Sequence, residues 1–254
     1  MSLPPEVASW PVLLGVLAIF LAAGTVKGGL GFGAPLASMS VLPLLIPIDL
    51  ALAINAVLLL TTNAVQFAGA GDMLPTLRRF SPVIAGMMLG VPLASLFVAR
   101  VDADILALVM GVGVCGFSVL TASGASMSVP PEREARVGVL TGIGSGLAGG
   151  LTAVPGPVLV AYLVGIGVER RPMLSALGFL LLASGLLVSS AFMAVGMLNV
   201  PRITLALLCL APTLAGMWLG NAVFERMEAG AFRRVVLLAL FLLGLNLIVR
   251  SLLV

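Results

Sequence analysis

Residues 27–36, KGGLGFGAPL, interrupt an otherwise apolar run with four glycines, a proline and the only lysine of the chain. We predict that a helix stops here and starts again, because glycine permits tight backbone turns and proline fits the first turn of a helix. The start of a helix exposes unpaired N–H groups and about half a positive charge. Together with the ammonium of Lys27, such a break has the chemistry of an anion-binding site.

A second break of the same kind lies in the segment GLAGGLTAVPGPVL, residues 146–159. Its GGLTAVPGPVL portion corresponds to GGLGFGAPL in the first break once a small gap is allowed. We predict that the helix starts at Pro35 and Pro157 meet at one pocket, which binds a small anion. The residues expected to form it are Lys27, Gly28, Gly29, Gly31, Gly33, Pro35, Gly149, Gly150, Thr152, Gly156 and Pro157.

Two other interpretations of these breaks stay open. Glycines in membrane helices often only let helices pack closely, and the segment GIGSGLAGG (142–150) fits that role. Lys27 could also extend its side chain to a membrane surface instead of binding a ligand.

Polar residues on a segment between the two breaks are further candidates. Asn55, Thr62 and Gln66 are spaced by seven and four residues, which places them on one helical face, and Asn63 lies beside them. We predict that they line the cavity and donate hydrogen bonds to the oxygens of the anion, although such residues also join neighbouring helices. Their expected counterparts in the second half are Ser175, Ser184, Thr152 and Tyr162.

The composition indicates the class of protein that positions these residues. Of 254 residues 61% are hydrophobic and 9% are charged, with a mean hydropathy of +1.24, whereas soluble domains carry about a quarter charged residues. We therefore predict an all-α integral membrane protein whose surroundings are a lipid bilayer. The net charge of +3 is too small to argue for nucleic acid as a partner.

Ten apolar segments follow one another along the chain. They are 13–30, 35–48, 50–69, 81–99, 105–123, 137–153, 157–168, 173–195, 203–223 and 235–253. The second and seventh reach only about 21 and 18 Å as helices, against roughly 30 Å of hydrocarbon. Because each follows a glycine-rich break, we predict about eight full transmembrane helices and two half-length broken or re-entrant segments.

Other chemistry is disfavoured by what the chain lacks. It has no histidine, and Cys115 and Cys209 are isolated in apolar runs, which argues against a zinc site and against histidine-based catalysis. We predict no catalytic residues, no metal and no cofactor, so the protein is not expected to be an enzyme; an assembly subunit would leave the paired breaks unexplained. The acidic residues lie near loops, so proton coupling, through Asp49 or Asp72 or on the substrate itself, stays open, as does homo-oligomerisation.

The chain repeats itself. SPVIAGMMLG (81–90) matches APTLAGMWLG (211–220), and the order of features is the same in both halves. We predict an N-terminal transmembrane repeat over 1–127, a polar cytoplasmic linker over 128–136 and a C-terminal transmembrane repeat over 137–254.

The arginines predict the orientation. If each short segment turns back, nine arginines fall on one side of the membrane, and only Arg100, Arg202 and Arg250 fall on the other. The nine are Arg78, Arg79, Arg133, Arg136, Arg170, Arg171, Arg226, Arg233 and Arg234. Since basic loops stay in the cytoplasm, the second half is predicted to be inverted relative to the first, an architecture of secondary transporters.

These motifs resemble the sulfite exporter TauE/SafE family of membrane permeases over residues 13–253. The resemblance rests on GGLGFGAPL and GLAGGLTAVPGPVL, on the repeated AG-x-x-L-G segments, and on Ala176 and Gly178 as an A-x-G motif. It implies a multi-pass protein of the cytoplasmic membrane that transports sulfite, sulfoacetate or a related organosulfonate, commonly outward. The segment ALAIN (51–55) departs from the small residues usual in the family, so another small anion, such as a carboxylate, is the alternative substrate.

Overall fold

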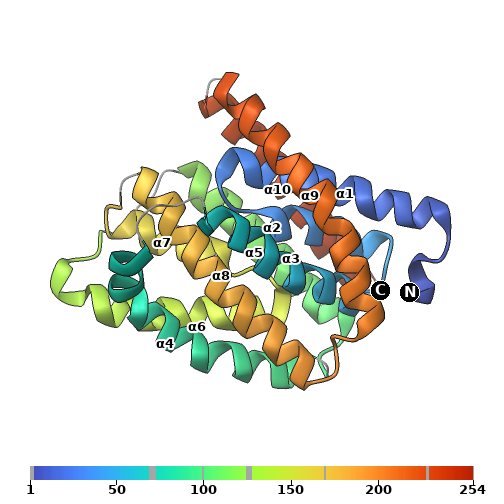
Figure 1. The fold of residues 1–254 in the computed structure, drawn as a ribbon, viewed down its shortest axis with the longest axis horizontal. Coiled ribbons are helices and arrows are strands. Elements are labelled where there is room, and N and C mark those ends of the chain that lie inside the picture. Colours follow the sequence, from blue (N-terminus) through green and yellow to red (C-terminus); the bar gives the residue numbers. More distant parts are fainter. Residues whose placement is uncertain are drawn as a thin grey trace.

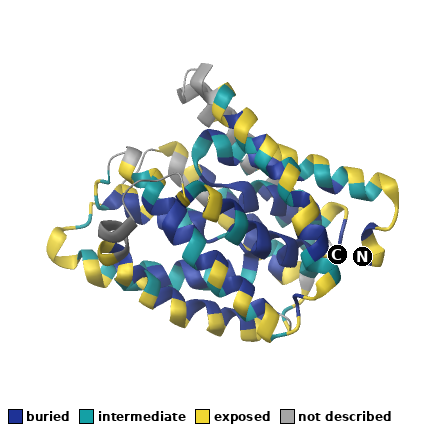
Figure 2. Cartoon of the chain, viewed as in Figure 1, coloured by how far each residue is buried: buried dark blue, intermediate teal, exposed yellow. Residues whose placement is uncertain are grey.

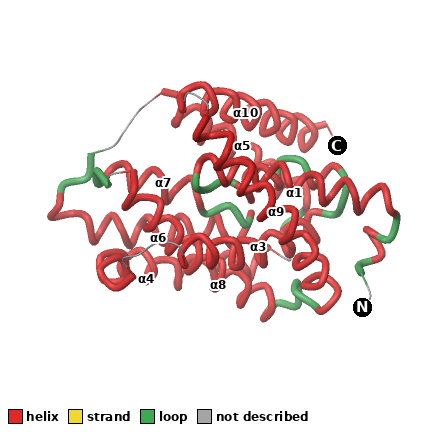
Figure 3. Tube along the Cα trace, turned by 45° about the horizontal axis from the view of Figure 1, so that its top comes forward, coloured by secondary structure: helices red, strands yellow, loops and turns green. Residues whose placement is uncertain are grey.

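The computed structural model describes residues 3–68, 73–98, 100–123, 128–168, 170–226 and 229–253. The described residues form helices, turns and loops, with no strand among them (Figure 3). The long helices are α1 (Trp10–Leu30), α3 (Ile48–Ala68), α4 (Met73–Val98), α5 (Ala103–Ser123), α6 (Glu134–Thr152), α8 (Arg170–Ala194), α9 (Val200–Arg226) and α10 (Ala229–Leu253). The short elements are α2 (Ala34–Met39), α7 (Gly156–Gly165) and the single turns Pro5–Val7, Leu42–Leu44 and Pro131–Arg133. Asp72 and residues 124–127, which end the first predicted repeat, lie outside the described residues.

The protein is an all-helical membrane protein. Within the described chain, five helical segments are long and apolar enough to cross a bilayer: Trp10–Leu30, Ile48–Ala68, Arg78–Val98, Pro172–Ala194 and Val200–Val223. Large apolar side chains such as Trp218 and Leu140 point outward, with 72% and 67% of their surface exposed. Such exposure suits contact with lipid rather than with water. Buried residues concentrate in the middle of the bundle (Figure 2).

Helices α1 and α9 lie side by side, and α4 and α6 form a similar pair at the opposite edge (Figure 1). A Cβ added to Gly24 would lie 2.2 Å from the carbonyl oxygen of Thr213, and one added to Gly28 would lie 2.1 Å from that of Met217. The two backbones therefore touch, and because both numbers rise together the two helices run in the same direction. Small residues permit this close contact between membrane helices.

The pair of α4 and α6 is built in the same way. A Cβ added to Gly86 would lie 2.2 Å from the carbonyl oxygen of Val139, and one added to Gly90 would lie 2.4 Å from that of Ile143. These helices also run in the same direction. The packing interpretation of GIGSGLAGG (142–150) thus describes Gly142, Gly146 and Gly150, which face α4, whereas Gly144 and Gly149 face α7 and α8.

The central helices α3 and α8 run in opposite directions. Ser189 of α8 donates a hydrogen bond to the carbonyl of Ala56 (3.0 Å), whereas Gly178 lies against Gln66 near the other end of α3. Residues 50–59 of α3 are all buried, which agrees with a stretch that is apolar on every side except at Asn55. Helices α5 and α10 form a second antiparallel pair, in which Cys115 approaches the carbonyl of Phe241.

Both predicted breaks are present, and they lie within the predicted stretches 27–36 and 146–159. Helix α1 ends at Gly31, which has a φ of +80° and donates its N–H to the carbonyl of Lys27. Helix α6 ends at Ala153, which has a φ of +57° and donates its N–H to the carbonyl of Gly149. Such left-handed caps satisfy the last carbonyls of a helix and turn the chain away from it.

The short segments restart where proline predicted. Pro35 lies in the first turn of α2 and Pro157 in the first turn of α7. The segment expected over 35–48 is wrong in length, since α2 stops at Met39. Pro43 and Pro47 disfavour a continuous α-helix through this stretch, because each lacks an N–H and its ring crowds the carbonyl four residues before it.

Replacing Gly216 by Ala tests the contact between α1 and α9. The new methyl group would lie 2.1 Å from the carbonyl oxygen of Leu21, so the helices must separate, and we expect the free energy of unfolding to fall by about 1–3 kcal/mol. The control is Gly113→Ala, whose Cβ meets no atom within 4 Å. Thermal unfolding of both variants in detergent measures the difference; equal melting temperatures would contradict the close contact.

Candidate anion-binding site

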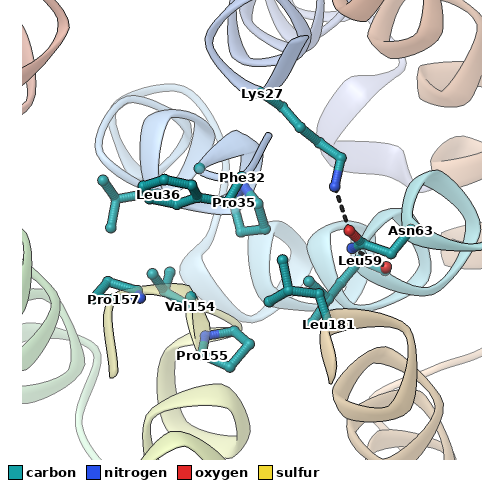
Figure 4. Close-up of a pocket in the computed structure, with 12 residues that line it drawn as sticks. Lys27, Phe32, Pro35, Leu36, Leu59, Asn63, Val154, Pro155, Pro157 and Leu181 are labelled. Atoms are coloured by element: carbon teal, nitrogen blue, oxygen red, sulfur yellow. Dashed lines mark hydrogen bonds between the residues drawn. The ribbon is translucent and has the colours of Figure 1, made fainter. Parts of the chain in front are cut away.

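The two breaks meet at one pocket (Figure 4). Its lining consists of Lys27, Phe32, Gly33, Pro35, Leu36, Leu59, Asn63, Val154, Pro155, Gly156, Pro157 and Leu181. The first half contributes α1, α2 and α3, and the second half contributes the α6–α7 connection, α7 and α8. The walls of the pocket are so close that roughly one water-sized body fits between them.

Lys27 brings a positive charge to this pocket. It lies in the last turn of α1 with 1% of its surface exposed, and its Nζ donates a hydrogen bond of 2.5 Å to Oδ1 of Asn63. Asn63 is oriented in turn because its Nδ2 donates to the carbonyl of Leu59 at 2.6 Å. The Lys27 side chain therefore points toward α3 and into the bundle, and does not extend to a membrane surface.

Among the described residues, no carboxylate pairs with the Lys27 ammonium. In the described part of the chain the ion pairs are Arg79–Glu134 and Arg202–Asp49, and both lie near helix ends. An ammonium has three N–H donors, and the hydrogen bond described for this one goes to neutral Asn63. Burying a charge without a counter-ion is costly. An anion bound in the pocket would supply both the opposite charge and the missing acceptors.

Asn55 and Thr62 point elsewhere. Asn55 accepts a hydrogen bond from Ser38 of α2 (2.7 Å), and its Nδ2 donates to the carbonyl of Ala51 (3.0 Å). Thr62 donates to the carbonyl of Leu58. The alternative role, joining helices, therefore describes Asn55, which ties α2 to α3.

Gln66 of α3 forms hydrogen bonds beside the first break. Its Nε2 donates to the carbonyls of Gly31 (3.0 Å) and Leu174 (3.3 Å), so it connects the end of α1 to α8. Thr152 plays a local part at the second break, where its hydroxyl donates to the carbonyl of Ala148 and accepts the N–H of Val154.

Several glycines expected in the pocket lie within helices and serve packing. Gly28 contacts α9, the backbone nitrogen of Gly29 lies 3.0 Å from the Cβ position of Gly220, and the Cβ position of Gly150 is 2.6 Å from that of Ala94. Of the predicted residues, the pocket brings together Lys27, Gly33, Pro35, Asn63, Gly156 and Pro157. It does not include Gly28, Gly29, Gly31, Asn55, Thr62, Gln66, Gly149, Gly150 or Thr152.

Most of the remaining lining is apolar and was not predicted. These residues are Phe32, Leu36, Leu59, Val154, Pro155 and Leu181. Phe32 and Pro155 lie inside the breaks and could have been proposed from their position alone. Leu59 and Leu181 belong to long apolar helices, where nothing in the sequence distinguishes a pocket residue from its neighbours.

The fold and the pocket define a class of protein. Helices that are long and apolar enough to cross a bilayer, together with two helix breaks that share a pocket with a buried lysine, are typical of a multi-pass membrane transport protein. The chain belongs to the sulfite exporter TauE/SafE family, whose model matches residues 16–247, nearly the whole chain, and the predicted family is thereby confirmed. Comparison with the curated proteins and with the solved structures gave no match. Membership implies a membrane transporter of sulfur anions such as sulfite, and it is consistent with a protein that is not an enzyme.

A substitution at Ser184 tests whether the buried hydroxyl beside the second break is without a hydrogen bond. Its buried hydroxyl has no hydrogen-bond partner and lies 3.3 Å from the Cβ position of Gly149. Ser184→Ala should raise the free energy of unfolding by about 1 kcal/mol or more, because it removes an unsatisfied polar group. Ser189→Ala is the control: it breaks the bond to Ala56 and should lower stability. Thermal unfolding without ligand measures both, and a loss of stability in Ser184→Ala would show that this hydroxyl is bonded.

Proposed function

We propose that the protein is a secondary transporter that exports a small sulfur-containing anion, namely sulfite, sulfoacetate or a related organosulfonate, across the cytoplasmic membrane. The observation that carries the proposal is the buried Lys27 ammonium, which faces a pocket between two helix breaks and pairs with no carboxylate among the described residues. Membership of a family of sulfite exporters supports the substrate class. Lys27 binds the anion, and Asn63 holds the ammonium in place.

We further propose that residues 1–127 and 137–254 are inverted repeats, joined by the linker 128–136, with eight full spans and two half-length segments. Exchanging α1–α5 for α6–α10 turns the α1–α9 pair into the α6–α4 pair and leaves α3–α8 and α5–α10 as pairs. The last two pairs are antiparallel, as a twofold axis in the membrane plane requires, and the first two share one relative direction, since both are parallel. The orientation predicted from the arginines also supports this arrangement. It gives each of the four pairs the same relative helix direction, parallel or antiparallel, as the packing contacts do.

Transport is proposed to proceed by alternating access at the breaks. Two side-chain contacts connect the proposed repeats on opposite sides of the pocket: Gln66 donates a hydrogen bond to the carbonyl of Leu174, and Arg202 forms an ion pair with Asp49. Both contacts are formed in this structure and the pocket is narrow, as in an occluded state. Breaking one contact at a time would expose the pocket to one side of the membrane and then to the other.

A permease or channel for another small anion, such as a carboxylate, is the second candidate. The same ammonium would bind a carboxylate, because its charge does not distinguish sulfur from carbon oxyanions. A thermal-shift panel of sulfite, sulfoacetate, taurine, sulfate and acetate separates the two candidates, since a bound ligand stabilises the folded protein by mass action. Stabilisation by acetate and not by sulfite or the organosulfonates would favour the second candidate.

Replacing Lys27 by Met tests the proposed site. Met keeps the length of the side chain and removes a buried charge that has no counter-ion, so we expect the protein without ligand to be at least as stable as the parent. Anion-induced stabilisation and export from proteoliposomes should both be lost. Thermal shift and flux assays measure these effects.

The control is Arg79→Met, which makes the same change of charge at an exposed pair with Glu134, away from the pocket. It should bind and transport like the parent. Normal binding and flux in Lys27→Met would remove Lys27 from the site.

A further inference from the structure

We propose that this pocket accepts anions of one negative charge and rejects dianions. The inference rests on the proposed function and narrows its substrate class. Among sulfur oxyanions it selects bisulfite and singly charged organosulfonates, and it rejects the sulfite dianion, sulfate and doubly charged sulfoacetate. This selection follows from the net charge that the pocket can neutralise.

The pocket contains one full charge. Lys27 comes from α1, and the side chains that α2, α3, α7 and α8 contribute to the lining are all neutral. The nearest acid along α3 is Asp49, fourteen positions before Asn63, and it is already paired with Arg202 of α9. On the linker side, Glu134 of α6 is paired with Arg79 of α4. The described lining therefore offers no second cation to a ligand and no acid that would compete for Lys27.

The backbone adds little net charge to the pocket. Each break places the carboxyl end of one helix beside the amino end of the next: α1 ends at Gly31 before α2, and α6 ends at Ala153 before α7. Helix ends carry partial charges of about −0.5 and +0.5, which largely cancel at each break. Helix α2 has only six residues, so its contribution is the smallest.

A second negative charge would have no partner in this pocket. Besides neutral Asn63 and the backbone of Gly33 and Gly156, the lining consists of the side chains of Phe32, Leu36, Leu59, Val154 and Leu181 and of prolines, which have no N–H to donate, so it holds no second cation. Burying an unpaired charge among such groups is strongly unfavourable. We therefore expect a dianion to bind at least about tenfold more weakly than a monoanion of similar size.

Sulfite and methanesulfonate together test this inference on the purified full-length protein. Sulfite changes from a monoanion to a dianion near neutral pH, whereas methanesulfonate keeps one charge throughout. The dissociation constants of both are measured by thermal shift or calorimetry from mildly acidic to mildly alkaline pH. Any titration of Lys27 affects both ligands equally, so the ratio of the two constants isolates the charge of the ligand.

The expected result is that the affinity for total sulfite, relative to methanesulfonate, falls by about tenfold for each pH unit above the ionisation of bisulfite. Sulfate should not displace bound methanesulfonate. A ratio that does not change with pH, or displacement by sulfate at concentrations similar to methanesulfonate itself, would overturn charge selection and leave the proposed transport function standing. Absence of binding by every sulfur oxyanion at every pH would overturn both.

Discussion

A buried ammonium without a counter-ion is the constraint on which the rest of this structure depends. An ammonium at Lys27 is stabilised inside an apolar bundle if the neighbouring groups orient it and, as we propose, an anion binds beside it. Asn63 meets the first condition with a single hydrogen bond. The break after Leu30 makes room for the second, because ending α1 one turn beyond Lys27 opens the space in which α2 and α7 begin.

Close packing and helix breaking are divided between different parts of the bundle. Glycine-mediated contacts join α1 to α9 and α6 to α4, and they bring the backbones together at the two edges. The breaks lie between these pairs, beside the central helices α3 and α8. This division gives two outer pairs in close backbone contact and a centre that contains the short helices α2 and α7, an arrangement that suits the alternating access proposed above.

Much of the functional core was predictable because it rests on local chemistry. Glycine, proline and an isolated lysine in an apolar run predict a break and a charge wherever they occur, and both breaks are found within a few residues of the predicted positions. The exact ends of the helices were not predictable in this way. Gly28 and Gly150 look like parts of a break in the sequence, yet they remain helical because each faces a neighbouring helix that can approach a glycine closely.

The sequence by itself determined the membrane class, the family, the two interrupted segments and the presence of one cation at the first of them, since these follow from composition and from residues adjacent in the chain. Only the tertiary structure decided which side chains share the pocket. Asn63 faces Lys27, whereas Asn55 and Thr62 on the same helix bond to other groups. On helix α3 all three of these side chains are buried, so burial alone does not decide which of them faces the pocket. That choice is made by how its neighbours pack.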